Sequence, residues 1–183
     1  MRALVLVLLF PFCVRAQKAD TLSQEDLKIV VTVIRQIDNF GNKEVVLLDS
    51  SNHSAWTKSV DQTLLSSTTL KGNKKECASI VTGYNAIIND TLTIGGNAMP
   101  DTNVFVVTKK QMLKKSWVDF VTDYPKADGY YSTSPLYHSA DGKYIALSLT
   151  KECGVMCGEG RNVIAEMVDG KWKVVYSAIA WVE

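Results

Sequence analysis

The fold is decided by the C-terminal stretch Tyr144-Ile-Ala-Leu-Ser-Leu-Thr-Lys-Glu-Cys153-Gly-Val-Met-Cys157-Gly-Glu-Gly160-Arg-Asn-Val-Ile-Ala-Glu-Met-Val168. Strand-like apolar runs at its two ends flank a turn rich in glycine and cysteine, which predicts a tight hairpin. The pair Asp169-Gly170 separates this hairpin from a third run, Trp172 to Val182, and Asp-Gly between strand-like runs is a strong indicator of a hairpin. This half of the chain is therefore expected to form an antiparallel meander.

The residues before this stretch predict further strands and three helices. A strand at 130–137 precedes the turn Asp141-Gly142, and buried strands are expected at 43–48 and 103–107. The helices are expected after a cap at Ser23, at 74–88, and at 109–123 after a cap at Thr108. The predicted apolar face of this last helix consists of Met112, Leu113, Trp117, Phe120 and Val121.

These elements indicate the α+β class. An antiparallel C-terminal meander of about four strands should pack against the N-terminal helices, and the strands at 43–48 and 103–107 should extend the sheet. In the last strand, strict alternation places Trp172, Val174, Tyr176, Ala178 and Ala180 on one face. It places Lys173, Val175, Ser177, Ile179 and Trp181 on the other.

The first 16 residues have the pattern of a secretory signal peptide. The basic start Met1-Arg2 is followed by an apolar run from Ala3 to Phe12, and Val14 and Ala16 occupy the −3 and −1 positions of a cleavage site. The run is shorter than the roughly 20 apolar residues that cross a bilayer. We expect a signal peptide at 1–16 and one exported domain at 17–183, periplasmic or extracellular, with no transmembrane segment.

The charge of the expected mature chain is close to balanced. Of 20 basic residues, cleavage removes Arg2 and Arg15 and leaves 18 against 19 acidic residues. A near-neutral chain lacks the basic excess of proteins that bind nucleic acid through bulk charge, so no nucleic-acid partner is expected.

Three cysteines follow the expected cleavage site. Cys153 and Cys157 have three residues between them in the hairpin turn, which allows the Cα separation of roughly 4.4–6.8 Å that a disulfide needs. We predict a disulfide that staples the turn. A redox-active pair is the alternative, although such motifs usually have two intervening residues and lie at a helix N-terminus. Cys77 falls on the apolar stripe of the helix at 74–88, where a buried thiol is expected, and its pairing with a turn cysteine stays open.

Three residues are candidates for binding. His138 precedes the Asp141-Gly142 turn with serines nearby, but no nucleophile elbow accompanies them. Arg161 follows Gly158-Glu-Gly160, whose spacing would let the backbone approach an anion, although positive φ angles in the turn also explain these glycines. Trp181 lies on the face opposite Trp172 and is the third candidate. With only His53 and His138 besides the cysteines, no metal is predicted, and no cofactor is expected.

The C-terminal third resembles a group of uncharacterised exported bacterial proteins. The shared features are Ser134-Pro135, Asp141-Gly142, Ala146-Leu147, the Cys-Gly-x-x-Cys-Gly-x-Gly turn from Cys153 to Gly160, and Gly170-Lys171-Trp172. This resemblance covers roughly 128–183 and implies export and a shared fold. The Gly-Lys-Trp strand is also similar to sheets of the nuclear-transport-factor-2-like superfamily, a likeness that would not define a function.

The sequence does not identify a catalytic residue, so whether the protein is an enzyme stays open. The favoured hypothesis is a non-enzymatic secreted or periplasmic module that binds an unknown ligand or partner through its sheet face and the cysteine turn. The alternative is a small envelope enzyme or thiol-redox protein that uses Cys153 and Cys157.

Overall fold

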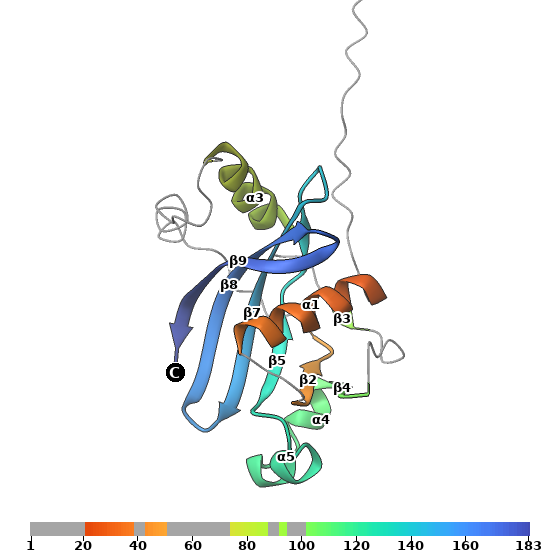
Figure 1. Ribbon diagram of the computed structural model, residues 1–183. Coiled ribbons are helices and arrows are strands. Elements are labelled where there is room, and N and C mark those ends of the chain that lie inside the picture. The colour runs from red at the N-terminus through yellow and green to blue at the C-terminus, as the bar shows by residue number, and fades with distance from the viewer. Residues whose placement is uncertain (1–20, 39–42, 51–73, 88–91, 95–101) are drawn as a thin grey trace, which may run out of the picture.

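A computed structural model describes residues 21–38, 43–50, 74–87, 92–94 and 102–183, and the predicted signal peptide lies outside them. Within these residues, a mixed seven-stranded sheet has the order β4-β2-β5-β7-β8-β9, with β6 paired to β7 (Figure 1). Its strands are β2 (Val45–Leu48), β4 (Val104–Val107), β5 (Tyr130–Thr133), β6 (Tyr137–His138), β7 (Tyr144–Gly154), β8 (Cys157–Val168) and β9 (Lys171–Val182). A separate parallel pair joins β1 (Thr21–Leu22) to β3 (Thr93–Ile94).

The α+β class and the C-terminal meander are confirmed. Strands β5, β7, β8 and β9 are adjacent and antiparallel in chain order. Strands β2 and β4 extend the sheet as predicted, but β2 pairs in parallel with both β4 and β5. All four residues of β2 are buried, which is typical of a parallel strand that is covered on both faces.

One face of the sheet is covered by α1 (Gln24–Ile37). The predicted cap is confirmed, because the Ser23 hydroxyl accepts a hydrogen bond from the Asp26 amide. The apolar stripe of α1 packs on alternate residues of the central strands, including Leu147 and Val163, and forms the largest core. Because the intervening residues face the other way, the meander has two chemically different surfaces.

Among the described residues, three helices cover the opposite face: α3 (Lys74–Ile87), α4 (Lys109–Met112) and α5 (Trp117–Asp123). Helix α3 packs on Ala146, Ile164 and Tyr176 through Tyr84 and its neighbours, whereas α4 and α5 cover Val46 and Leu48 of β2. The middle of this face lies between the two groups of helices. The side chain of Cys77 is outside the described residues, so its predicted burial is not tested.

The prediction of one helix over 109–123 is wrong. The chain forms α4, leaves the helix, and restarts α5 with a capping box in which Ser116 and Asp119 satisfy each other's backbone amides. The restart rotates the apolar face. Met112 and Phe120 are buried, but Leu113 is 78% exposed and Val121 is 42% exposed.

The strict alternation predicted for the last strand is also wrong. Irregularities between Ile164 and Ala165 and between Gly160 and Arg161 each insert one residue into β9. As a result Trp172 packs towards α1, but Tyr176 packs towards α3. Two insertions restore the original phase, so Trp181 still faces away from Trp172 as predicted.

Among the described residues, no helix combines the length and apolar character that crossing a bilayer demands.

Candidate functional site

Polar side chains and glycines gather on the sheet between the residues that α3 contacts and those that α4 and α5 cover, and most of them are buried. We call this cluster the polar patch; it lies on the face opposite α1. It consists of Tyr130 and Ser132 on β5, Ser148, Thr150 and Glu152 on β7, and Gly158, Gly160 and Asn162 on β8. These residues alternate with residues of the large core, which places them on one face.

The strand register arranges the polar patch in rows. Tyr130 is opposite Glu152, which is opposite Gly158. In the next row, Ser132 is opposite Thr150, which is opposite Gly160, and Gly160 is opposite Trp181 on β9. Antiparallel pairing therefore brings together short polar side chains that are far apart in the sequence.

A buried hydrogen-bond chain holds the end of the patch nearest α3. The Tyr84 hydroxyl donates to Ser148 Oγ at 2.8 Å, and the Ser148 hydroxyl donates to Asn162 Oδ1 at 2.7 Å. Asn162 is only 1% exposed, and its Nδ2 has no hydrogen-bond partner. Exchanging the two amide atoms would leave the oxygen unpaired instead, so one polar atom of Asn162 is unsatisfied in either orientation.

A cavity of about 320 Å³ lies between α4 and the other end of the polar patch. Its lining residues are Leu48, Ser50, Lys109, Met112, Leu113, Tyr130, Ser132 and Glu152. This volume is at the small end of the range of roughly 300–1,000 Å³ for small-molecule sites, and the lining is more polar than is usual for such sites. The cavity is therefore the candidate binding site.

Glu152 is the acidic group of this cavity. Burial raises its pKa, and the nearby Glu183 carboxylate raises it further. Burial also raises the pKa of Tyr130, with a smaller contribution from the charge of Glu152. The Oε2 atoms of Glu152 and Glu183 each lie 3.4 Å from the position that a Cβ on Gly158 would occupy, so two carboxylates share one edge of the patch.

Trp181 lies over the two glycines of β8. A Cβ on Gly160 would overlap its indole nitrogen, and one on Gly158 would lie 3.2 Å from its Cζ3. The interpretation that Gly158 and Gly160 provide positive φ angles is wrong, because the positive angles of the turn belong to Gly154 and Met156. These two glycines instead leave room for the indole ring.

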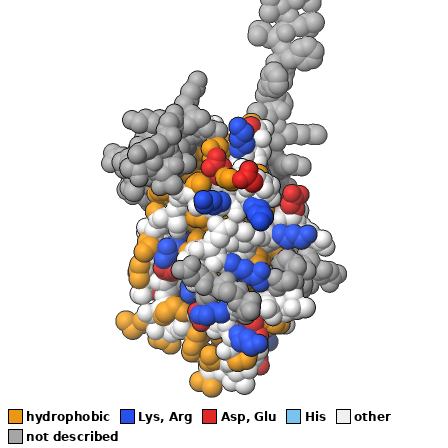
Figure 2. Space-filling model, viewed as in Figure 1, with side chains coloured by type: hydrophobic (Ala, Val, Ile, Leu, Met, Phe, Trp, Pro, Cys, Tyr) orange, Lys and Arg blue, Asp and Glu red, His pale blue; other side chains and the backbone are white. Residues whose placement is uncertain are grey.

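The cysteine turn forms a closed, protruding tip. Cys153 and Cys157 are joined by a disulfide, with Cα atoms 5.1 Å apart. Between them, Val155 is 90% exposed and Met156 is 83% exposed. A Cβ on Gly154 would contact the Trp117 indole at 3.7 Å, so the tip lies beside α5. Figure 2 shows exposed apolar side chains at this lower edge, where Figure 1 places α5 and the turn.

Removing the disulfide should lower the stability modestly. The Cys153→Ser/Cys157→Ser variant is expected to lose about 2 kcal/mol of unfolding free energy, since chain entropy predicts little for a five-residue loop. Urea unfolding measures the loss, and Ser177→Ala, at an exposed serine of β9 away from the turn, is the control. Alkylation of the parent before and after reduction should find the turn cysteines protected only before reduction. A pair alkylated without reduction in protein from its own envelope would contradict the staple.

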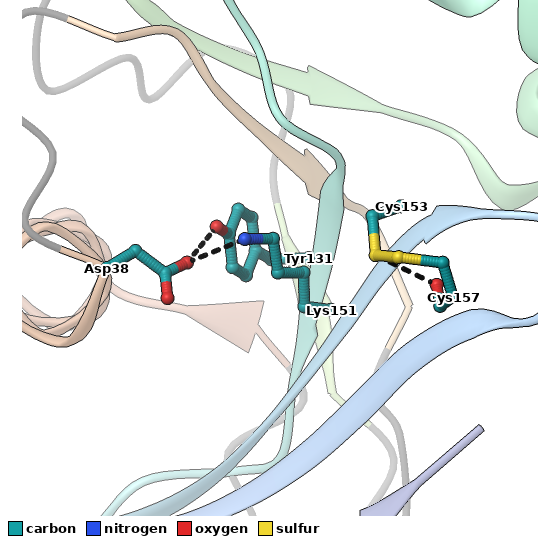
Figure 3. The surroundings of a disulfide bond; sticks show 5 residues. All are labelled: Asp38, Tyr131, Lys151, Cys153 and Cys157. Carbon is teal, nitrogen blue, oxygen red and sulfur yellow. Dashed lines mark hydrogen bonds and ion pairs between the residues drawn. A yellow bond between two sulfur atoms is a disulfide. The ribbon is translucent and has the colours of Figure 1, made fainter.

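Arg161 lies on the other face, beside α1. Its guanidinium donates to both carboxylate oxygens of Glu159, at 2.8 and 3.0 Å. Close by, the Tyr131 hydroxyl donates to Asp38, and Lys151 Nζ lies 3.3 Å from the same carboxylate (Figure 3). Burial and the hydrogen bond to Asp38 raise the pKa of Tyr131. This charged cluster closes the C-terminal end of α1, and the cavity of about 10 Å³ beside it has room for about one water molecule.

His138 lies at the N-terminal end of α1. Its Nε2 is 2.8 Å from Asp26 Oδ1, and the Ser139 hydroxyl donates to Asp141 rather than to the histidine. Burial raises the pKa of Asp26, but hydrogen bonds from His138 and Ser23 together with the charge of His138 outweigh it, so the net pKa is lowered. No group of three or more His, Cys, Asp or Glu side chains with metal-binding geometry occurs in the described residues.

The three predicted binding residues do not meet. His138 and Arg161 lie towards opposite ends of α1, and only Trp181 faces the polar patch. Sequence reasoning missed Glu152, Ser132 and Lys109, which line the cavity. One indication was available: Tyr130-x-Ser132 and Ser148-x-Thr150-x-Glu152 repeat polar residues at every second position, which places them on one face of their strands.

Comparison with known proteins found no relative: no protein-family model, no curated protein and no solved structure matches this chain.

Proposed function

We propose that the protein is an exported, non-enzymatic binding module that takes a small polar ligand into the cavity between α4 and the polar patch. The observation that carries the proposal is the cavity itself, whose lining combines three hydroxyls and two opposite charges with the apolar side chains of Leu48, Met112 and Leu113. Polar groups in a binding site fix the orientation of a ligand, and the predominantly polar lining of this cavity suits a small polar one.

Two features support export. The first 16 residues have the pattern of a secretory signal peptide, and the cysteine pair forms a disulfide. Disulfides persist in oxidising compartments such as the periplasm, where a stapled turn would keep its shape. The exposed tip formed by Val155 and Met156 is the surface we assign to contact with a partner.

Filling the cavity should abolish ligand binding. Ser132 is buried at the cavity wall, so in Ser132→Leu the larger apolar side chain would displace a ligand and remove a hydroxyl. Ligand-observed NMR with a mixed set of amino acids, short peptides, sugars, nucleosides and fatty acids should find a compound that binds the parent and not this variant.

Ser177→Leu is the matched control, because Ser177 is an exposed strand serine that does not line the cavity. Circular dichroism and thermal unfolding should show that both variants keep the fold. Binding that is equally strong in the folded Ser132→Leu protein would place the site elsewhere, and a set from which no compound binds would overturn the proposal.

A further inference from the structure

The cavity contains one basic and one acidic side chain that are not paired. Lys109 and Glu152 both line it, and neither forms an ion pair or a side-chain hydrogen bond within the described part of the chain. The other lining residues are neutral. Lys109 is exposed and Glu152 is half-buried, so a ligand group of opposite charge could reach each of them and form a charge-assisted hydrogen bond.

The two charges enter from opposite sides of the cavity. Glu152 is on β7, whereas Lys109 begins the helix that follows β4, and β2 and β5 lie between these strands. Three strand intervals of about 4.8 Å separate their backbones by roughly 14 Å across the sheet. The Glu152 carboxylate lies next to Gly158 on β8, so the Glu152 side chain does not shorten this gap.

A ligand that meets both charges must carry an ammonium group and a carboxylate several ångströms apart. In a single amino acid both groups are attached to one carbon, which is too close. A chain of two or three residues spans at most about 7–11 Å, because an extended residue covers about 3.3–3.6 Å. With a charge-assisted hydrogen bond of about 2.8 Å at each end, this length covers the gap.

We propose that the cavity binds a peptide of two or three residues by its free ends, with the amino terminus at Glu152 and the carboxyl terminus at Lys109. This inference rests on the proposed function and specifies the ligand class. Leu48 and Met112 provide apolar wall for the peptide side chains, and Ser132 provides a hydroxyl between the two ends. The carboxylates of Glu183 and Glu152 both lie next to Gly158. The negative charge of Glu183 therefore adds to the attraction for an ammonium group.

The test compares trialanine with its two blocked forms. Isothermal titration calorimetry with the full mature chain should show saturable binding of trialanine. Acetylation of the amino terminus removes the ammonium group, and amidation of the carboxyl terminus removes the carboxylate. Each change should weaken binding at least tenfold, since each removes a charge-assisted hydrogen bond.

Charge-removing variants should assign each end of the peptide. Glu152→Gln should weaken the binding of trialanine at least tenfold and should not further weaken the binding of the acetylated form. Lys109→Met should weaken the binding of trialanine by a similar factor and should not further weaken the binding of the amidated form. Lys110→Met, one residue along α4 and outside the cavity lining, and Glu25→Gln, exposed on the far face, are the matched controls. Thermal unfolding confirms that every variant is folded.

The outcomes separate this inference from the proposed function. If trialanine shows no saturable binding while another compound binds the parent and fails with Ser132→Leu, the peptide inference is overturned and the binding cavity stands. If trialanine binds but either charge-removing variant weakens the binding of trialanine and of both blocked forms by the same factor, the assignment of the two ends is wrong. If no compound is sensitive to Ser132→Leu, both proposals are overturned.

Discussion

Gly129→Ala is expected to lower the free energy of unfolding by about 3 kcal/mol, at the upper end of overpacking costs. A methyl group on Gly129 would overlap the backbone oxygen of Glu152 and would lie 3.2 Å from its carbonyl carbon and 3.3 Å from the Cα of Cys153. All three atoms belong to the backbone of β7, which strands on both sides hold in the sheet. No side-chain rotation relieves the overlap, so a strand must move.

Gly142→Ala is the matched control for this prediction. Gly142 is in a turn with φ of 70°, and a Cβ there would have nothing within 4 Å. Its replacement should cost only the local backbone strain of a left-handed alanine, about 1 kcal/mol. Urea unfolding followed by tryptophan fluorescence measures both losses. Equal losses for the two variants would show that β7 adapts to the methyl group and that the close approach is not important for stability.

The position of Gly129 connects this contact to the cavity. The next residue is Tyr130, which is opposite Glu152 in the sheet, and both line the cavity. The close approach of Gly129 to β7 therefore sets the start of β5 at the place where the cavity wall begins. A displaced strand would move the hydroxyl of Tyr130 and the carboxylate of Glu152 together.

The sequence predicted the parts of the fold that depend on local signals. The two Asp-Gly pairs and the cysteine turn join strands that are neighbours in the chain, so the meander followed from turn chemistry. The parallel pairing of β2 with β4 and β5 did not follow. These strands are brought together through connections of more than 50 residues and through the burial of Val45 to Leu48 on both faces, which no local pattern specifies.

The broken helix shows how an apolar stripe can conceal a boundary. Ser116-Trp-Val-Asp119 has the spacing of a capping box and predicts a helix start on its own. The apolar positions on each side of it continue at helical spacing, and this favoured one long helix. The break matters for the site, because α4 is set apart as a single turn whose Lys109 and Met112 line the cavity.

The candidate site was only partly predictable, because it depends on contacts between elements that are distant in the sequence. The two insertions in β9 depend on which residues of β8 it meets, so they are invisible in β9 alone. The cavity requires α4, β2, β5 and β7 to be placed together, and these elements are distant in the sequence. The cysteine turn is the most distinctive motif of the sequence, but the polar patch lies on the strands that lead to and from it.

Gly160→Ala is expected to lower the free energy of unfolding by about 2 kcal/mol in the parent protein. The added methyl group would overlap the indole nitrogen of Trp181 and lie 2.5 Å from its Cδ1 and Cε2 atoms. The ring must leave its place over β8, and its packing on the glycines is lost. Unlike the overlap at Gly129, this one involves a side chain, so a second substitution should relieve it.

In a Trp181→Ala background the sign of the effect should reverse. Removing the indole ring removes the three atoms nearest to the added methyl group. Alanine also loses less backbone freedom on folding than glycine, which favours it by roughly 0.5–1 kcal/mol in a strand. A double-mutant cycle measured by urea unfolding gives the difference between the two backgrounds as the coupling energy. Gly158→Ala, whose methyl group would lie 3.2 Å from Trp181, should show a smaller coupling of the same sign. Additive losses at Gly160 and Trp181 would mean that the glycines serve the turn itself. A large coupling would mean that β8 carries glycine so that Trp181 can form the wall of the polar patch beside Glu152.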